Sequence, residues 1–260
     1  MLALIFRRLR PGRRPAILRE DFAGTSAEAV AWVASGATRR AIAVECDAPT
    51  VTWAQRRAVR ILGQRAKRVQ FVTADVLTVA PPAVAAADLI SVLNFSVCYF
   101  QQRASLGEYF RHARRCLKTD GALVLNLFGG PGARRVQTVK HLITPRPRLA
   151  TESAIPPFEY HWEQRSWNAA ARRLDCRIHF VVPNGANPAK PRIIRNAFRY
   201  DWRLWTVNEL TSLLRNAGFA EVQLWRHAVT LDRGGTGFFL GPVKSIPKLD
   251  TWVAYVVGIC

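Results

Sequence analysis

The sequence predicts an α/β fold: a Rossmann-like, doubly wound sheet of seven strands that is mostly parallel and has an antiparallel C-terminal strand. Three observations carry this prediction. Short apolar segments alternate with helical patterns as far as residue 127, which is typical of strands joined by helical crossovers. Residues 146–204 change character and predict an inserted β-hairpin or small antiparallel sheet. One further helix and two strands follow the insertion.

Five strands and three helices are expected before the insertion. The strands are predicted at residues 16–18, 41–44, 69–73, 88–93 and 122–127, and the helices at 27–34, 49–62 and 106–117. In the second helix, for example, Val51, Ala54 and Ala58 recur at three- and four-residue steps and share one face. Parallel strands joined in this way have both faces of their sheet covered by helices.

The second part of the chain reads differently. Alternating strands are predicted at residues 158–167 and 173–182, with a third at 196–202, and we expect this insertion to act as a lid over the ligand crevice. Thr206 and Glu209 form a capping box, which begins a helix that ends at Gly218. Residues 221–226 and 251–257 are predicted to be the last two strands, paired antiparallel.

The composition favours a soluble, cytoplasmic protein with a single domain, residues 1–260. No segment approaches 18 consecutive apolar residues, so we expect no transmembrane helix and no membrane partner. The basic N-terminal segment, residues 1–14, has too short an apolar part for a signal peptide. The five cysteines lack C-x-x-C spacing, which favours reduced thiols and no metal site.

The chain is a strongly basic protein, with 38 Lys and Arg against 18 Asp and Glu and a formal net charge of +20. Such an excess raises the local concentration of polyanions, so RNA is one candidate partner. The arginines are spread over the whole length in pairs, however, which is typical of a solvated surface. The charge alone leaves both interpretations open.

Residues 16–47 form a strand, loop, helix and strand that end in an acid, the pattern of a nucleoside-binding unit. The loop, predicted at residues 19–26, holds one glycine, Gly24, with Phe22 and Ser26 where further glycines are expected. A pyrophosphate requires several bare backbone N–H groups, which this loop lacks. Glu20 and Asp21 repel phosphate and tolerate a sulfonium. The sequence therefore favours a cationic, phosphate-free nucleoside ligand.

The segment Leu18-Arg19-Glu20-Asp21-Phe22-Ala23-Gly24-Thr25 resembles the LREDFCGT variant of motif I in class I S-adenosylmethionine-dependent methyltransferases. Ala23 replaces the cysteine that is common in this variant. The resemblance extends through later motifs in order: residues 44–47, 74–76, 93–96, 125–130 and 200–205. It implies S-adenosyl-L-methionine as the cofactor and methyl transfer as the activity. Relatives often have an N-terminal helix that closes over the cofactor, and residues 1–14 take its place here.

The resemblance also implies roles for individual residues. Motif I packs against the methionine and ribose, Glu45 holds both ribose hydroxyls, and Asp75 accepts from the adenine amino group while the Val76 backbone N–H donates to the ring. Asn94 follows the fourth strand, where the methyl group meets its acceptor. The implied cofactor-binding residues are Glu20, Phe22, Ala23, Gly24, Thr25, Glu45, Cys46, Asp75, Val76, Asn94 and Phe95.

Methyl transfer is an in-line displacement at an activated carbon, so the protein supplies alignment, desolvation and in some cases a base. Asn94 and Tyr160 are the candidate catalytic residues, and Tyr99 and His161 are further candidates. His112 is predicted to be a surface residue. The tryptophans at 162, 167, 202 and 205 either stack a ligand or form the core of the inserted sheet.

Two alternative functions remain open at this point. A methyltransferase-like fold without turnover could bind RNA electrostatically. An NAD-dependent oxidoreductase fits Glu45 and the strand-helix-strand unit but not the loop. The methyl acceptor, either a small molecule or RNA, and the oligomeric state are not encoded in any motif.

Overall fold

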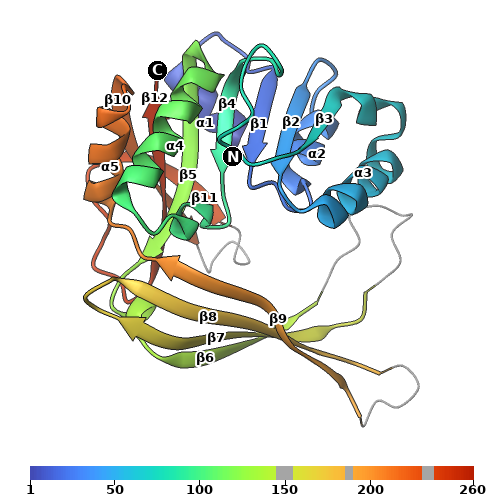
Figure 1. Ribbon diagram of the computed structural model, residues 1–260, viewed down its shortest axis with the longest axis vertical. Coiled ribbons are helices and arrows are strands. Elements are labelled where there is room, and N and C mark those ends of the chain that lie inside the picture. Colours follow the sequence, from blue (N-terminus) through green and yellow to red (C-terminus); the bar gives the residue numbers. More distant parts are fainter. Residues whose placement is uncertain (145–154, 185–189, 230–236) are drawn as a thin grey trace. The chain divides into compact units, whose positions relative to one another are not determined.

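The computed structural model describes residues 1–144, 155–184, 190–229 and 237–260. The chain divides into two compact units. One comprises Met1–Phe128, Trp205–Lys248 and Trp252–Cys260, and the other comprises Gly129–Leu204 and Leu249–Thr251. Figure 1 shows the two sheets on which these units are built.

The first unit contains an eight-stranded sheet in the order β11-β10-β12-β5-β4-β1-β2-β3. The first five strands along the chain pair in parallel: β1 (Ile17–Asp21), β2 (Arg40–Glu45), β3 (Val69–Thr73), β4 (Ala87–Val92) and β5 (Leu117–Gly129). β10 (Glu221–Val229) pairs antiparallel with β12 (Trp252–Ile259). The α/β class, the parallel core and the antiparallel C-terminal strand are therefore confirmed.

Three details of the strand prediction are wrong. β5 begins at Leu117, directly after α4, rather than at residue 122. The sheet has eight strands rather than seven, because β11 (Gly237–Val243) adds an antiparallel edge beside β10. Its sequence, GFFLGPV, contains two glycines and a proline, which a sheet tolerates at an edge and which conceal the strand pattern. β1 continues to Asp21, although residues 19–21 were expected in a loop. Charged residues inside a buried strand are not a usual strand signal.

Within the described residues, five α-helices accompany the sheet: α1 (Leu2–Leu9), α2 (Ala27–Ala34), α3 (Ala48–Leu62), α4 (Arg103–Cys116) and α5 (Val207–Asn216). α1, α2 and α3 contribute to one hydrophobic core with Leu18 of β1, and Ile5 and Phe6 of α1 are almost fully buried in it. α4 and α5 contact each other (Figure 1). Both capping hydrogen bonds predicted for α5 are present between Thr206 and Glu209. No helix in the described part of the chain is long and apolar enough to cross a membrane.

The second unit contains a four-stranded antiparallel sheet in the order β6-β7-β8-β9. Its strands are β6 (Gln137–Ile143), β7 (Phe158–Asn168), β8 (Arg173–Val182) and β9 (Arg192–Arg203). A small antiparallel sheet after β5 was predicted, but β6 was not. The predicted start of the insertion, residue 146, lies outside the described residues.

One face of this small sheet is lined by aromatic side chains. Tyr160 contacts Phe180 of β8 with 6.0 Å between ring centroids, and Trp162 contacts Trp202 of β9 at 5.8 Å. Trp202 is 3% exposed, and Trp205, in the other unit, is 2% exposed. The burial of Trp202 and Trp205 supports a structural role for these two residues over the ligand-stacking alternative. Trp162 and Trp167 are only partly buried, and both alternatives stay open for them.

Candidate functional site

The motif I loop has the backbone conformation of a glycine-rich loop, although it contains a single glycine. Phe22, Gly24 and Ser26 have φ angles of +55°, +49° and +53°. Such left-handed conformations strain residues that carry a Cβ atom. Phe22 is held there by its side chain, which lies 5.7 Å from the Tyr109 ring between centroids. The positions at which the sequence lacks the expected glycines are therefore the ones that keep glycine-type geometry.

Glu20 is buried at the end of β1 and faces the N-terminus of α2. Its Oε2 accepts a hydrogen bond from the Ala29 backbone N–H at 2.8 Å. Burial, followed by the nearby Glu28 carboxylate, raises the pKa of Glu20 from 4.5 to about 8. Burial also raises the pKa of Glu28. Two carboxyl groups in this position favour a cation as neighbour.

The Glu45 carboxylate is fixed by three backbone donors. Gly24 N–H donates to Oε2 at 2.8 Å, while Cys46 N–H and Asp47 N–H donate to Oε1 at 2.9 and 3.0 Å. The motif I loop is further tied to β2 because Ala23 N–H donates to the Val44 carbonyl at 3.0 Å. Both Glu45 oxygens are therefore oriented at the carboxyl end of β2, where open α/β sheets bind ligands. Cys46 contributes its backbone, and its side chain is exposed.

Asp75 and Val76 lie in a segment of turns that follows β3. Asp75 is exposed, and its Oδ1 accepts from the Leu77 backbone N–H at 2.8 Å. Ala74 N–H donates to the Glu45 carbonyl at 3.1 Å, which joins this segment to the end of β2. Val76 is buried. The loops after β1, β2 and β3 are therefore contiguous.

Asn94 and Phe95 form the turn after β4. Both have left-handed backbones, with φ angles of +59° and +61°. Phe95 N–H donates to the Asn126 side chain at 2.8 Å, and its ring lies 4.9 Å from that of Phe128. Asn94 is exposed and Phe95 is partly buried. Because β4 neighbours β1 in the sheet, this turn lies at the same edge as motif I.

The structure therefore brings the predicted cofactor-binding residues of motif I together with Glu45, Asp75, Val76, Asn94 and Phe95 in the first unit. Thr25 lies in the same loop and is exposed. Tyr160 belongs to the second unit. Burial raises the pKa of its hydroxyl, and its catalytic role stays a prediction.

A buried polar network behind these loops was missed by the sequence analysis. Arg19 Nε donates to Asp21 Oδ1 at 2.6 Å, and the Tyr109 hydroxyl donates to Asp21 Oδ2 at 2.8 Å. His112 Nε2 lies 2.9 Å from the Val79 carbonyl. His112 is 5% exposed, so its prediction as a surface residue is wrong. The signal for this network was the acid two residues after Arg19, on the same face of a strand.

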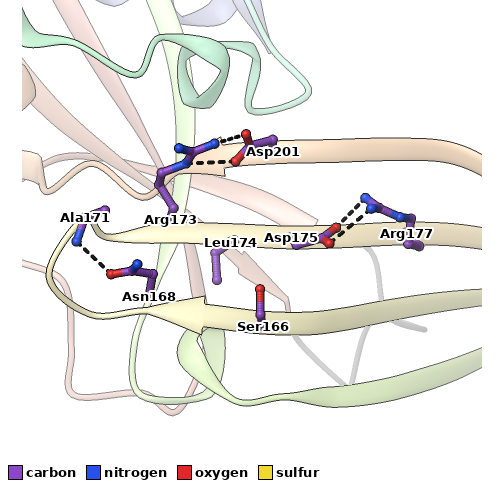
Figure 2. A pocket seen from close by; sticks show the side chains of 8 residues that line it. All are labelled: Ser166, Asn168, Ala171, Arg173, Leu174, Asp175, Arg177 and Asp201. Atoms are coloured by element: carbon purple, nitrogen blue, oxygen red, sulfur yellow. Dashed lines mark hydrogen bonds and ion pairs between the residues drawn. The ribbon is translucent and has the colours of Figure 1, made fainter.

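A cavity of about 420 Å³ lies in the second unit, beside the β7–β8 turn. Figure 2 shows its lining: Ser166, Asn168, Ala171, Arg173, Leu174, Asp175, Arg177 and Asp201. Arg173 pairs with Asp201, and Arg177 pairs with Asp175. The charges in the lining therefore balance each other, and none of the predicted site residues lines this cavity.

The residues of the first unit fit S-adenosylmethionine. The loop carries no cluster of free N–H donors for a phosphate, because the Ala23 and Gly24 N–H groups are already bonded within the site. Ser26 is 1% exposed, and its hydroxyl has no hydrogen-bond partner among the described residues. A buried hydroxyl without a partner is costly and suits a site that receives a polar ligand.

Comparisons with known proteins identify other proteins that share this fold. No protein-family model matches the chain, and no curated protein matches it in sequence. Among solved structures, DesVI of Streptomyces venezuelae aligns over 99% of this chain and 88% of its own, with a TM-score of 0.69 and 14% identity. The sugar N-methyltransferase KedS8 from a Streptoalloteichus species aligns over 99% and 84%, with a TM-score of 0.64 and 16% identity.

A third neighbour is CalS10, an amino pentose methyltransferase from Micromonospora echinaspora whose structure has S-adenosylmethionine bound. It aligns over 98% of this chain and 88% of its own, with a TM-score of 0.62 and 16% identity. Sequence identities this low indicate a shared fold and do not show a shared activity. The chain has the α/β, Rossmann-like fold of S-adenosylmethionine-dependent methyltransferases.

Proposed function

We propose that this protein transfers the methyl group of S-adenosyl-L-methionine to a small-molecule acceptor, and that it belongs to the glycine-poor, LREDFCGT-type subgroup of class I methyltransferases. The observation that carries the proposal is the Glu45 carboxylate, held by three backbone N–H groups beside a left-handed motif I loop. A carboxylate fixed in this way is prepared to accept two hydrogen bonds from a ribose diol.

The cofactor supplies an electrophilic methyl group on a positively charged sulfur. Glu45 accepts hydrogen bonds from the ribose hydroxyls, and Asp75 and the Val76 backbone bind the edge of the adenine ring. Glu20 and the motif I residues border the cationic methionine part, where carboxyl groups offset its charge. Asn94 orients the acceptor at the end of β4. These residues act by holding and desolvating the reactants, which is the main contribution that a methyl transfer needs.

A small-molecule acceptor is supported by the structural neighbours, which include a sugar N-methyltransferase and an amino pentose methyltransferase. RNA is the competing acceptor, since the chain carries a formal net charge of +20. Tyr160 of β7 stays a candidate for positioning the acceptor. Burial raises the pKa of its hydroxyl, so this group keeps its proton and acts as a hydrogen-bond donor rather than as a base.

Calorimetric titration tests the cofactor assignment. We expect S-adenosylhomocysteine and S-adenosylmethionine to bind and NAD not to bind. A preference for NAD, or no heat with either adenosyl compound, would overturn the proposal.

The acceptor is tested with radiolabelled S-adenosylmethionine and cell extract, before and after treatment with RNase or protease. We expect label in the small-molecule fraction, insensitive to both treatments. Label that disappears with RNase would replace the small-molecule acceptor by RNA. The Glu45→Gln variant in the same assay controls for methyl transfer by contaminating enzymes.

A further inference from the structure

The segment between β3 and β4 carries Asp75 and Val76, yet it forms turns only, with no helix to fix its backbone. Its carbonyl groups therefore need donors from elsewhere in the fold. Arg19 supplies two of them: Nη1 donates to the Val79 carbonyl at 2.6 Å and Nη2 donates to the Val76 carbonyl at 3.0 Å. These bonds anchor both ends of a four-residue stretch that begins one residue after Asp75.

Arg19 is itself held rigidly. Its side chain and that of Asp21 are both fully buried, and their ion pair spans 2.6 Å. All three guanidinium nitrogens have acceptors, and the second Asp21 oxygen accepts from the Tyr109 hydroxyl at 2.8 Å. Burial raises the pKa of Tyr109 well above its ordinary value, so the hydroxyl keeps its proton and remains a donor.

The network also reaches the motif I loop. The Tyr109 ring contacts the Phe22 ring, and Phe22 has a left-handed backbone that its side-chain packing must hold. A buried ion pair of this kind contributes little net stability compared with apolar side chains of the same volume. Stability therefore does not explain why this network joins β1, α4 and the segment after β3.

We propose that Arg19, held by Asp21 and Tyr109, is a positioning residue that fixes the adenine-binding segment, so that base discrimination at Asp75 depends on this buried network. The inference rests on the proposed function, because it assigns Asp75 and Val76 to the adenine ring. Asp75 accepts from an amino group, and it repels the carbonyl oxygen that replaces this group in an inosine analogue.

The test compares the affinities of S-adenosylhomocysteine and S-inosylhomocysteine by calorimetry. The Arg19→Met/Asp21→Leu variant removes the ion pair without leaving a buried unpaired charge. We expect the wild-type protein to prefer the adenosyl compound by about tenfold or more. In the double variant we expect this ratio to fall to about twofold, because an unanchored Asp75 discriminates less. Amide hydrogen exchange of residues 76–79 should accelerate selectively.

Lys118→Met is the matched control. Lys118 pairs with Asp88 at 2.8 Å, and Asp88 binds the backbone of Ala16 and Ile17 at the amino end of β1, away from the ligand edge. This variant loses an ion pair in the same unit, and it should keep the wild-type discrimination ratio. Tyr109→Phe removes one hydrogen bond of the network and should give an intermediate ratio, which decides the question if the double variant does not fold.

An unchanged ratio in the folded double variant, or in Tyr109→Phe where only that variant folds, overturns the positioning role. A wild-type protein that binds neither compound overturns the proposed function instead, so the two failures are distinguishable. A loss of stability with an unchanged ratio would show that the network is structural only.

Discussion

At the scale of single residues, the site depends on a few carboxylates whose environments differ sharply. Glu45 is partly buried and bonded to three backbone N–H groups. Glu20, on the neighbouring strand, is buried beside Glu28 and has a raised pKa. The first group is oriented to accept hydrogen bonds, whereas the second ionises at a cost that a cationic ligand offsets.

Glu45→Gln should weaken the binding of S-adenosylhomocysteine by roughly 10- to 100-fold, because two charge-assisted hydrogen bonds to the ribose become neutral ones. Calorimetry measures the change. Asp47→Asn is the matched control, since this neighbouring acid caps α3 by accepting from Thr50 N–H at 2.9 Å. Because Asn caps a helix about as well as Asp, this variant should change stability by less than about 0.5 kcal/mol and leave the affinity unchanged. Equal losses in both variants would contradict the role of Glu45.

Glu20 should make the protein less stable as the pH rises. The folded pKa is about 8, against an ordinary value of 4.5, so between these values the unfolded chain has lost a proton that the folded chain keeps. Its contribution to stability is therefore fully present below pH 4.5 and is lost as the pH rises through 8. Urea unfolding of Glu20→Gln should lack this decline, which is on the order of a few kcal/mol.

Glu108→Gln, at an exposed glutamate of α4, should keep the wild-type pH dependence. A decline of the same size in Glu20→Gln would show that other groups cause it.

At the scale of elements, the motif I loop and α1 are the informative cases. The loop has a glycine-type backbone at Phe22 and Ser26, with the costs that a Cβ atom brings. α1 begins at Leu2 and packs Ile5 and Phe6 into the core, although the sequence suggested only a basic segment there. Each element has a consequence for stability that a substitution can measure.

Ser26→Gly should stabilise the protein by roughly 1 kcal/mol. It relieves a left-handed backbone and removes a buried hydroxyl without a partner, and these gains exceed the entropy cost of glycine. The same variant should bind S-adenosylhomocysteine more weakly if the hydroxyl faces the ligand. Thermal unfolding and calorimetry measure the two effects. Ser35→Gly, at the C-cap of α2 where φ is −85°, is the control and should not stabilise.

Phe6→Ala should cost about 3–5 kcal/mol, because it leaves a cavity under α1 in the main core. Arg7→Ala, one residue further on the exposed side of the same helix, should change stability by less than about 0.5 kcal/mol. Urea unfolding compares the two. A small effect of Phe6→Ala would mean that α1 is not part of the cooperative core.

The sequence predicted elements with ordinary local signals and missed those held by distant contacts. The Thr206–Glu209 capping box and the helix at residues 27–34 carry local signals, and both are present. Arg19 and Asp21 looked like a loop, because their burial depends on Tyr109, far away in sequence. His112 looked like a surface residue for the same reason: the Val79 carbonyl beside it comes from another element.

At the scale of the whole molecule, charge is the dominant feature. A formal net charge of +20 destabilises a compact chain through self-repulsion. Raising NaCl from 50 to 300 mM should therefore raise the melting temperature by roughly 2–5 °C, since the screening length shortens. An uncharged osmolyte at matched osmolality is the control. A melting temperature that does not respond to salt would mean that surface ion pairs already balance the repulsion.

The order of the strands has a consequence for biosynthesis. β12 lies between β5 and β10 in the sheet, although the whole small sheet and α5 are translated between β5 and β12. While these residues leave the ribosome, the backbone N–H and C=O groups on one edge of β5 have no neighbouring strand. Such an edge can pair with strands of other chains and cause aggregation. Expression at high rate should therefore favour inclusion bodies, and a chaperone that shields nascent strands should raise the yield of native protein.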